Sequence, residues 1–165
     1  QWRVKSLTEQ LQRKEPTSND AYPLEKMVSL PSSVADALQL ATEAFPKKII
    51  ALPEAVRSAQ AHASGSANET WQILLGLATV LHPLCFSDNP EKDGSITDTY
   101  KRMTGYDLSL RESKATNDVP AYVRARRRTY EGRIIDITPH VKGRSGKRGE
   151  TLRVHFAIDE KPNEL

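Results

Sequence analysis

Two residues near the C-terminal end, Arg153 and His155, are the clearest candidates for chemistry. Apolar residues stand at every second position from Leu152 to Ile158, with Arg153 and His155 between them. This alternation is typical of a strand with one buried face. We therefore expect Arg153 and His155 to lie together on the opposite face.

His140 and Lys142 follow the preceding predicted strand and could complete a ribonuclease site. Cleavage of RNA by its own 2′-hydroxyl needs a base, an acid and a cation on the phosphate, and histidine titrates in the range for the first two roles. The catalytic candidates are thus Arg153, His155 and His140, in a metal-independent reaction. The spacing does not place His140 on the face of Arg153, and a surface histidine or a hydrogen-bonded sheet histidine is the alternative for each ring.

Positive charge is concentrated in residues 121–153, which hold ten Lys or Arg and three acidic residues, although the whole chain carries only +3. Clustered cations neutralise phosphates and release counterions, so this segment is predicted to bind nucleic acid. Tyr122 and Tyr130 flank the arginines and could stack on bases. The predicted nucleic-acid-binding residues are Arg124, Arg126, Arg127, Arg128, Tyr130, Arg133, Lys142, Arg144, Lys147 and Arg148.

These cations and tyrosines also have simpler interpretations. The charges could form a solvated surface or face an acidic partner protein, and the tyrosines could be half-buried packing residues.

Other kinds of site find no support in the sequence. No carboxylates have the spacing of a two-metal nuclease, so we expect no metal. The glycines from Gly143 to Gly149 lack the spacing of a phosphate-binding Walker loop, so we expect no nucleotide cofactor. Cys85 is the single cysteine, which excludes an intrachain disulfide and suits a reducing cytoplasm.

Helices are predicted over most of the first two thirds of the chain. Apolar spacing and capping residues indicate helices over about 2–14, 34–45, 53–63, 69–81 and 96–104. Ser33 and Ser95 are the predicted caps of the second and fifth helices, Pro53 lies in the first turn of the third, and Gly105 ends the fifth. The expected buried faces are Val34, Leu38, Ala41 and Phe45 in the second helix and Ile96, Tyr100 and Met103 in the fifth. The fourth is the most hydrophobic, so we expect it to be central and to end at His82-Pro83. The segment from Lys47 to Leu52 is predicted to be either a helical turn or a short strand, and we prefer the helix.

Strands are predicted near Leu108, over 133–138 and over 151–158, with Glu131-Gly132 as a tight turn. Residues 114–118 are predicted to form a loop. The fold class is therefore α+β, with a helical domain over 1–118 and a basic antiparallel sheet module over 119–165.

Both ends of the sequence suggest a fragment, because it begins at Gln1 rather than Met and ends at the expected start of another strand. The longest apolar run, Ile73 to Leu81, is far short of the roughly 20 residues of a membrane span. We expect a cytoplasmic protein with no membrane contact.

The two predicted strands, Tyr130 to Ile137 and Leu152 to Asp159, together resemble the central sheet of the RelE and ParE families of bacterial toxins. The resemblance covers about a fifth of the chain. The resemblance implies a compact bacterial sheet module that binds and cuts RNA with basic and aromatic residues. By the pattern of those families Arg153 would be a functional residue, with Arg133 and Lys142 as its neighbours. Those toxins do not contain the predicted helical domain of this chain, and this sequence does not contain their closing strand.

Two functions follow from these observations. The first is a bacterial nucleic-acid-binding protein, of toxin or phage-defence type, that acts on RNA rather than DNA through its basic sheet. The second is a non-enzymatic subunit of a larger defence assembly that docks a partner, such as an acidic protein or an antitoxin.

Overall fold

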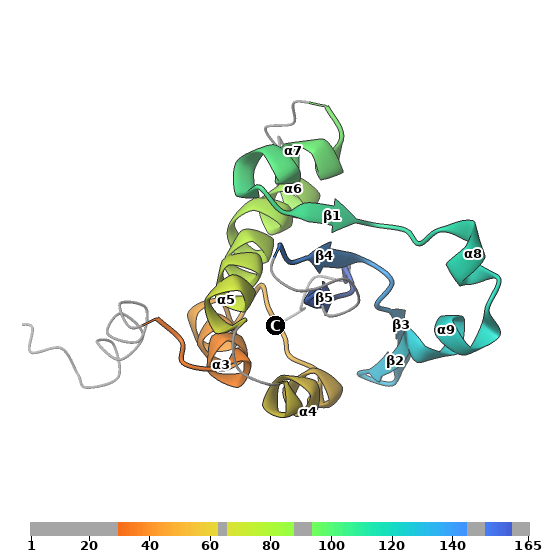
Figure 1. Cartoon of the computed structure of the whole chain (residues 1–165), viewed down its shortest axis with the longest axis horizontal. Helices are drawn as coiled ribbons and strands as arrows, with labels where there is room; N and C mark the ends of the chain where they lie inside the picture. Colours follow the sequence, from red (N-terminus) through yellow and green to blue (C-terminus); the bar gives the residue numbers. More distant parts are fainter. Residues whose placement is uncertain (1–29, 63–65, 88–93, 145–150, 160–165) are drawn as a thin grey trace, which may run out of the picture. The chain divides into compact units, whose positions relative to one another are not determined.

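The computed structural model describes residues 30–62, 66–87, 94–144 and 151–159. From Pro31 onward these residues belong to one compact unit of helices and antiparallel strands, which confirms the α+β class (Figure 1). The helix predicted over 2–14 lies outside the described residues, as does most of the glycine-rich loop. Among the described residues, no helix has the length and hydrophobicity of a membrane span.

Helix α3 (Val34–Ala44) begins at the predicted cap, where Ser33 Oγ accepts a hydrogen bond from the backbone N–H of Asp36. Val34 and Ala41 are buried as expected, but Ala37 and Leu40 are buried in place of Leu38 and Phe45. Ala37, Leu40 and Ala41 pack on α5, whereas Leu38 is only partly buried. Small residues at the contact let the two helices approach closely, and that packing decided the rotation of α3.

Helix α4 (Pro53–Ala61) begins with its proline in the first turn, as predicted. The preceding residues Lys47 to Leu52 form a turn followed by residues without regular secondary structure, so the expected helix there is wrong. Lys48 and Ile49 donate their backbone N–H groups to the carbonyl of Phe45. The chain thereby turns before α4.

Helix α5 (Ala67–Gly76) is central, as predicted, and contributes Ile73 to the main core. Its predicted end at His82-Pro83 is wrong, because a π-helical turn, η1 (Leu77–Leu81), leads directly into α6 (His82–Phe86) (Figure 1). Pro83 has no N–H and its ring would clash with the carbonyl four residues before it. The wider turn of η1 places Pro83 in the first turn of α6, where proline is tolerated.

Helix α7 (Ile96–Thr104) has the predicted cap at Ser95 and the predicted stop at Gly105, whose φ is 73°. Tyr100 is fully buried, but Met103, expected inward, is 58% exposed. A Cβ atom on Gly76 of α5 would lie 2.8 Å from the Tyr100 hydroxyl. Glycine is therefore what allows α7 to lie against the central helix.

The main sheet has the order β1-β4-β5, with both pairings antiparallel. Its strands are β1 (Asp107–Ser109), β4 (His140–Lys142) and β5 (Arg153–His155). Leu108 and Val141 lie in the main core, and Val154 packs against it. The predicted strand near Leu108 and the predicted buried face of 151–158 are thus confirmed.

A separate hairpin joins β2 (Arg127–Tyr130) to β3 (Arg133–Asp136). Its turn residues, Glu131 and Gly132, have φ of 48° and 73°, the left-handed geometry of the predicted tight turn. Two short helices precede it, α8 (Lys114–Asn117) and α9 (Pro120–Ala125). The loop predicted over 114–118 is wrong, because Ser113 Oγ accepts the N–H of Thr116 and starts a helical turn.

The domain boundary predicted between residues 118 and 119 stays a prediction. Strand β1 lies before that point and pairs with β4, which lies after it.

Replacing Ile73 by alanine should lower the free energy of unfolding by about 2–5 kcal/mol, because the side chain is completely buried and its removal leaves a cavity. Ile134→Ala removes the same atoms from a side chain that is 75% exposed and should change stability by less than about 0.5 kcal/mol. Chemical denaturation of both variants gives the comparison. Equal losses would contradict this assignment of the core.

Candidate functional site

The candidate site is the polar face of the main sheet, opposite the core. In the antiparallel register His140 stands opposite His155, and Lys142 stands opposite Arg153. Residues directly opposite each other share a face. The structure therefore brings His140 to the face that Arg153 and His155 were predicted to share, a placement that spacing along the chain left open.

The two histidine rings lie against each other, with centroids 4.9 Å apart and planes at 34°. Nδ1 of His140 is 3.0 Å from the Thr138 carbonyl, and Nδ1 of His155 is 3.0 Å from the Ile137 carbonyl. A carbonyl oxygen only accepts, so both Nδ1 atoms donate. These bonds hold both rings to the segment between β3 and β4.

Access differs between the two rings. His140 is only 2% exposed, so its ring lies beneath the surface, whereas His155 is half-buried. Arg153, on the same strand as His155, is exposed. A ligand at this face would meet Arg153 and His155 before His140.

A buried ion pair lies beside His140. Arg126 Nη2 is 2.8 Å from Glu112 Oε1, and the two side chains are 15% and 13% exposed. The same Glu112 oxygen lies 3.6 Å from His140 Nδ1. Arg126, predicted to contact nucleic acid, is thus occupied inside the protein.

Burial lowers the pKa of His155 below its ordinary value of 6.5, and the positive charge of Arg126 and the neighbouring His140 act in the same direction. The bond to Ile137 and the charge of Glu112 oppose this shift without cancelling it. His155 is therefore neutral near pH 7, with its Nδ1 proton committed to a carbonyl.

Two further predicted contact residues are also used within the fold. Arg133 makes a two-bond ion pair with Asp159, at 3.2 and 2.8 Å. Arg144 donates to the carbonyls of Gly105 and Thr104, and its guanidinium lies 4.5 Å from the centre of the Tyr106 ring. Both side chains stabilise the ends of strands.

The remaining predicted contacts make fewer or only local bonds: Arg128 donates to the neighbouring carbonyl of Arg127 at 2.8 Å, and the Tyr130 hydroxyl interacts with Glu131. Arg124 and Arg127 are exposed, Arg128, Tyr130 and Lys142 are half-buried, and Lys147 and Arg148 lie outside the described residues. Within the described part of the chain, no carboxylate lies within 4 Å of the Arg124, Arg127, Arg128, Lys142 or Arg153 charge. Arg124, Arg127 and Arg153 are thus the exposed cations available to an anion. Arg128 and Lys142 are partly engaged, by the Arg127 carbonyl and by Asp107 opposite Lys142.

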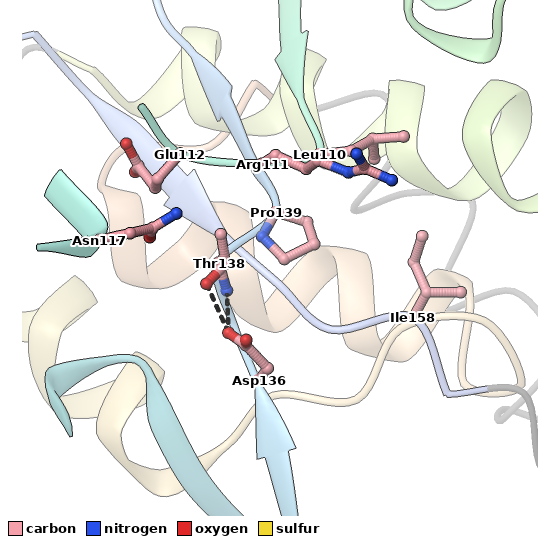
Figure 2. A pocket seen from close by; sticks show the side chains of 8 residues that line it. All are labelled: Leu110, Arg111, Glu112, Asn117, Asp136, Thr138, Pro139 and Ile158. Carbon is pink, nitrogen blue, oxygen red and sulfur yellow. Dashed lines mark hydrogen bonds between the residues drawn. The ribbon is translucent and has the colours of Figure 1, made fainter. Parts of the chain in front are cut away.

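An open pocket of about 440 Å³ adjoins this region (Figure 2). Asp136 lies on its wall, and one of its oxygens accepts from the N–H and the hydroxyl of Thr138, at 2.8 and 2.6 Å. Sequence reasoning missed this pocket, because Glu112 and Asn117 are isolated polar residues far from Asp136 along the chain. The lining residues are Leu110, Arg111, Glu112, Asn117, Asp136, Thr138, Pro139 and Ile158.

The chain matched no protein-family model, no curated protein and no solved structure. The resemblance to RelE and ParE toxins therefore stays a prediction.

Replacing Glu112 by alanine should lower the free energy of unfolding by about 3 kcal/mol, because it leaves Arg126 buried without its counter-charge. Asp107→Ala is the matched control, since it breaks the Lys101–Asp107 pair, in which both side chains are more than 60% exposed. The control should lose far less stability, because exposed pairs contribute little. Denaturation curves that rank the two variants the other way would contradict the importance of the buried pair.

Stability should fall as the pH drops from 6.5 toward 5, because the unfolded chain then protonates His155 and the folded protein resists doing so. His155→Gln should weaken this dependence, whereas His62→Gln, at an exposed position after α4, should retain it. Unfolding free energies measured between pH 5 and 8 provide the test. A His155→Gln profile identical to the wild-type profile would rule out His155 as its source.

Proposed function

We propose that this chain binds nucleic acid, RNA in preference to DNA, through the unpaired cations of its sheet and hairpin. The observation that carries the proposal is the position of Lys142 on β4 directly opposite Arg153 on β5. Like charges directly opposite each other on neighbouring strands are destabilising. Asp107 stands directly opposite Lys142 on the other side and feels its charge, but this one carboxylate is ion-paired with Lys101 at 2.8 Å. A bound phosphate would relieve the repulsion.

The arginines of α9 and β2 support the same proposal. Arg124, Arg127 and Arg128 lie within five consecutive residues, and none has a carboxylate partner in the described part of the chain. Tyr122, on α9, is 55% exposed and offers a ring face for stacking. Phosphate and base contacts would thus lie close together.

RNA cleavage, and with it a role as a bacterial toxin or in phage defence, extends this proposal. A neutral, half-buried His155 beside the exposed Arg153 suits a general base next to a phosphate-binding cation. His140 is too deeply buried to act as the acid without moving. Its closeness to His155 favours a positioning role in that reaction.

Docking to a partner protein is the second candidate. Ile134 is 75% exposed on the hairpin face that also carries Arg127 and Asp136. This apolar side chain could contact a partner protein but not a phosphate, although a single exposed isoleucine is also ordinary at a protein surface. Stable association with an acidic protein, without affinity for nucleic acid, would favour this candidate.

The double variant Arg127→Ala/Arg153→Ala should bind single-stranded RNA more weakly, with the slope of log affinity against log salt reduced by about 0.7 for each arginine removed. The matched control is Lys47→Ala/Arg57→Ala, which removes the same charge from exposed positions near α4 and should leave the slope unchanged. Titrations of labelled RNA across a salt series measure both. Equal slopes in all three proteins would contradict the proposed surface.

A further inference from the structure

The pocket beside the hairpin is lined by residues that could bind a nucleic-acid base. Leu110, Pro139 and Ile158 supply apolar surface, and Asn117 and Asp136 supply polar groups (Figure 2). Its volume of about 440 Å³ falls within the range of ligand sites, about 300–1,000 Å³. Apolar side chains beside polar groups suit a flat heterocycle, which has two apolar faces and a polar edge.

Two carboxylates of this pocket each keep one oxygen free as a hydrogen-bond acceptor, beside the donors of Asn117 and Arg111. Asp136 Oδ1 is used by Thr138, while its Oδ2 has no hydrogen bond to any described residue. Glu112 directs Oε1 to Arg126 and likewise leaves Oε2 without a bond inside the described structure. Single acceptor oxygens are complementary to an amino group, as when a carboxylate accepts from the N4 amine of cytosine.

Phosphate-binding charge lies next to these acceptors. Asp136 stands directly opposite Arg127 across the hairpin, so their β-carbons are about 5 Å apart by strand geometry. Arg111 lines the pocket itself and is exposed. A strand whose phosphate rests on Arg127 could therefore turn a base toward Asp136.

We infer that the pocket takes one unpaired base that carries an exocyclic amine, cytosine or adenine, from the nucleic acid held by the arginines. The inference rests on the proposed function and adds base preference to it. Asp136 is the specificity-determining residue, and Asn117 gives a second polar contact at the base edge.

The test compares oligocytidine with oligouridine, because the two bases have the same ring size and differ in the N4 amine and the O4 carbonyl. The wild-type protein should bind oligocytidine about tenfold more tightly than oligouridine at one salt concentration, the discrimination of one good polar contact. Asp136→Asn keeps an oxygen for Thr138 and replaces the free oxygen by an amide donor. This variant should lose the preference for cytidine or reverse it.

Asp118→Asn is the matched control, since it removes the same charge from an exposed position outside the pocket. It should keep the wild-type ratio, even if the smaller negative charge strengthens binding of both oligomers. Equal binding of both oligomers by the wild type, with salt dependence intact, would overturn the base pocket and leave the proposed function standing. A cytidine preference that survives Asp136→Asn would also overturn it, and absence of salt-dependent binding would overturn both proposals.

Discussion

The pairing of β4 with both β1 and β5 is the constraint on which the rest of the structure depends. Because side chains alternate along a strand, the pairing that puts Val141 into the core also puts His140 and Lys142 on the opposite face. A shift of one residue would exchange the two sets and expose the core. The register that stabilises the fold is therefore the one that assembles the polar face.

The polar face is divided into a buried part and an open part. Near His140 the chain covers it, and the cost of removing Glu112 and Arg126 from water is offset by their mutual attraction and by neighbouring hydrogen bonds. Near Lys142 and Arg153 the face is open: Asp107 stands opposite Lys142 but is paired with Lys101, and no described carboxylate lies within 4 Å of the Lys142 or Arg153 charge. The end near Lys142 and Arg153 is therefore suited to anion binding, whereas the residues near His140 stabilise the fold.

The density of basic residues along the chain predicts more nucleic-acid contacts than the structure leaves available, because several arginines bind other parts of the protein. The planar guanidinium of arginine can hold a carboxylate or two carbonyls in fixed geometry. Arg126, Arg133 and Arg144 are used in this way. The arginines left for a ligand are those whose neighbours in space, rather than in sequence, carry no acid.

Local patterns determined much of this protein by themselves. The caps at Ser33 and Ser95 and the turn at Glu131-Gly132 rest on contacts between residues close in sequence, and the structure confirms them. The alternation around Val154 follows from the two-residue repeat of a strand and is also confirmed. Tertiary structure alone decided the contact of His140 with His155, the pairing of Glu112 with Arg126, the continuation of the central helix past Pro83 and the pocket at Asp136. Most of these features depend on contacts between segments that only packing brings together, and burial then sets how strongly their charges and hydrogen bonds interact.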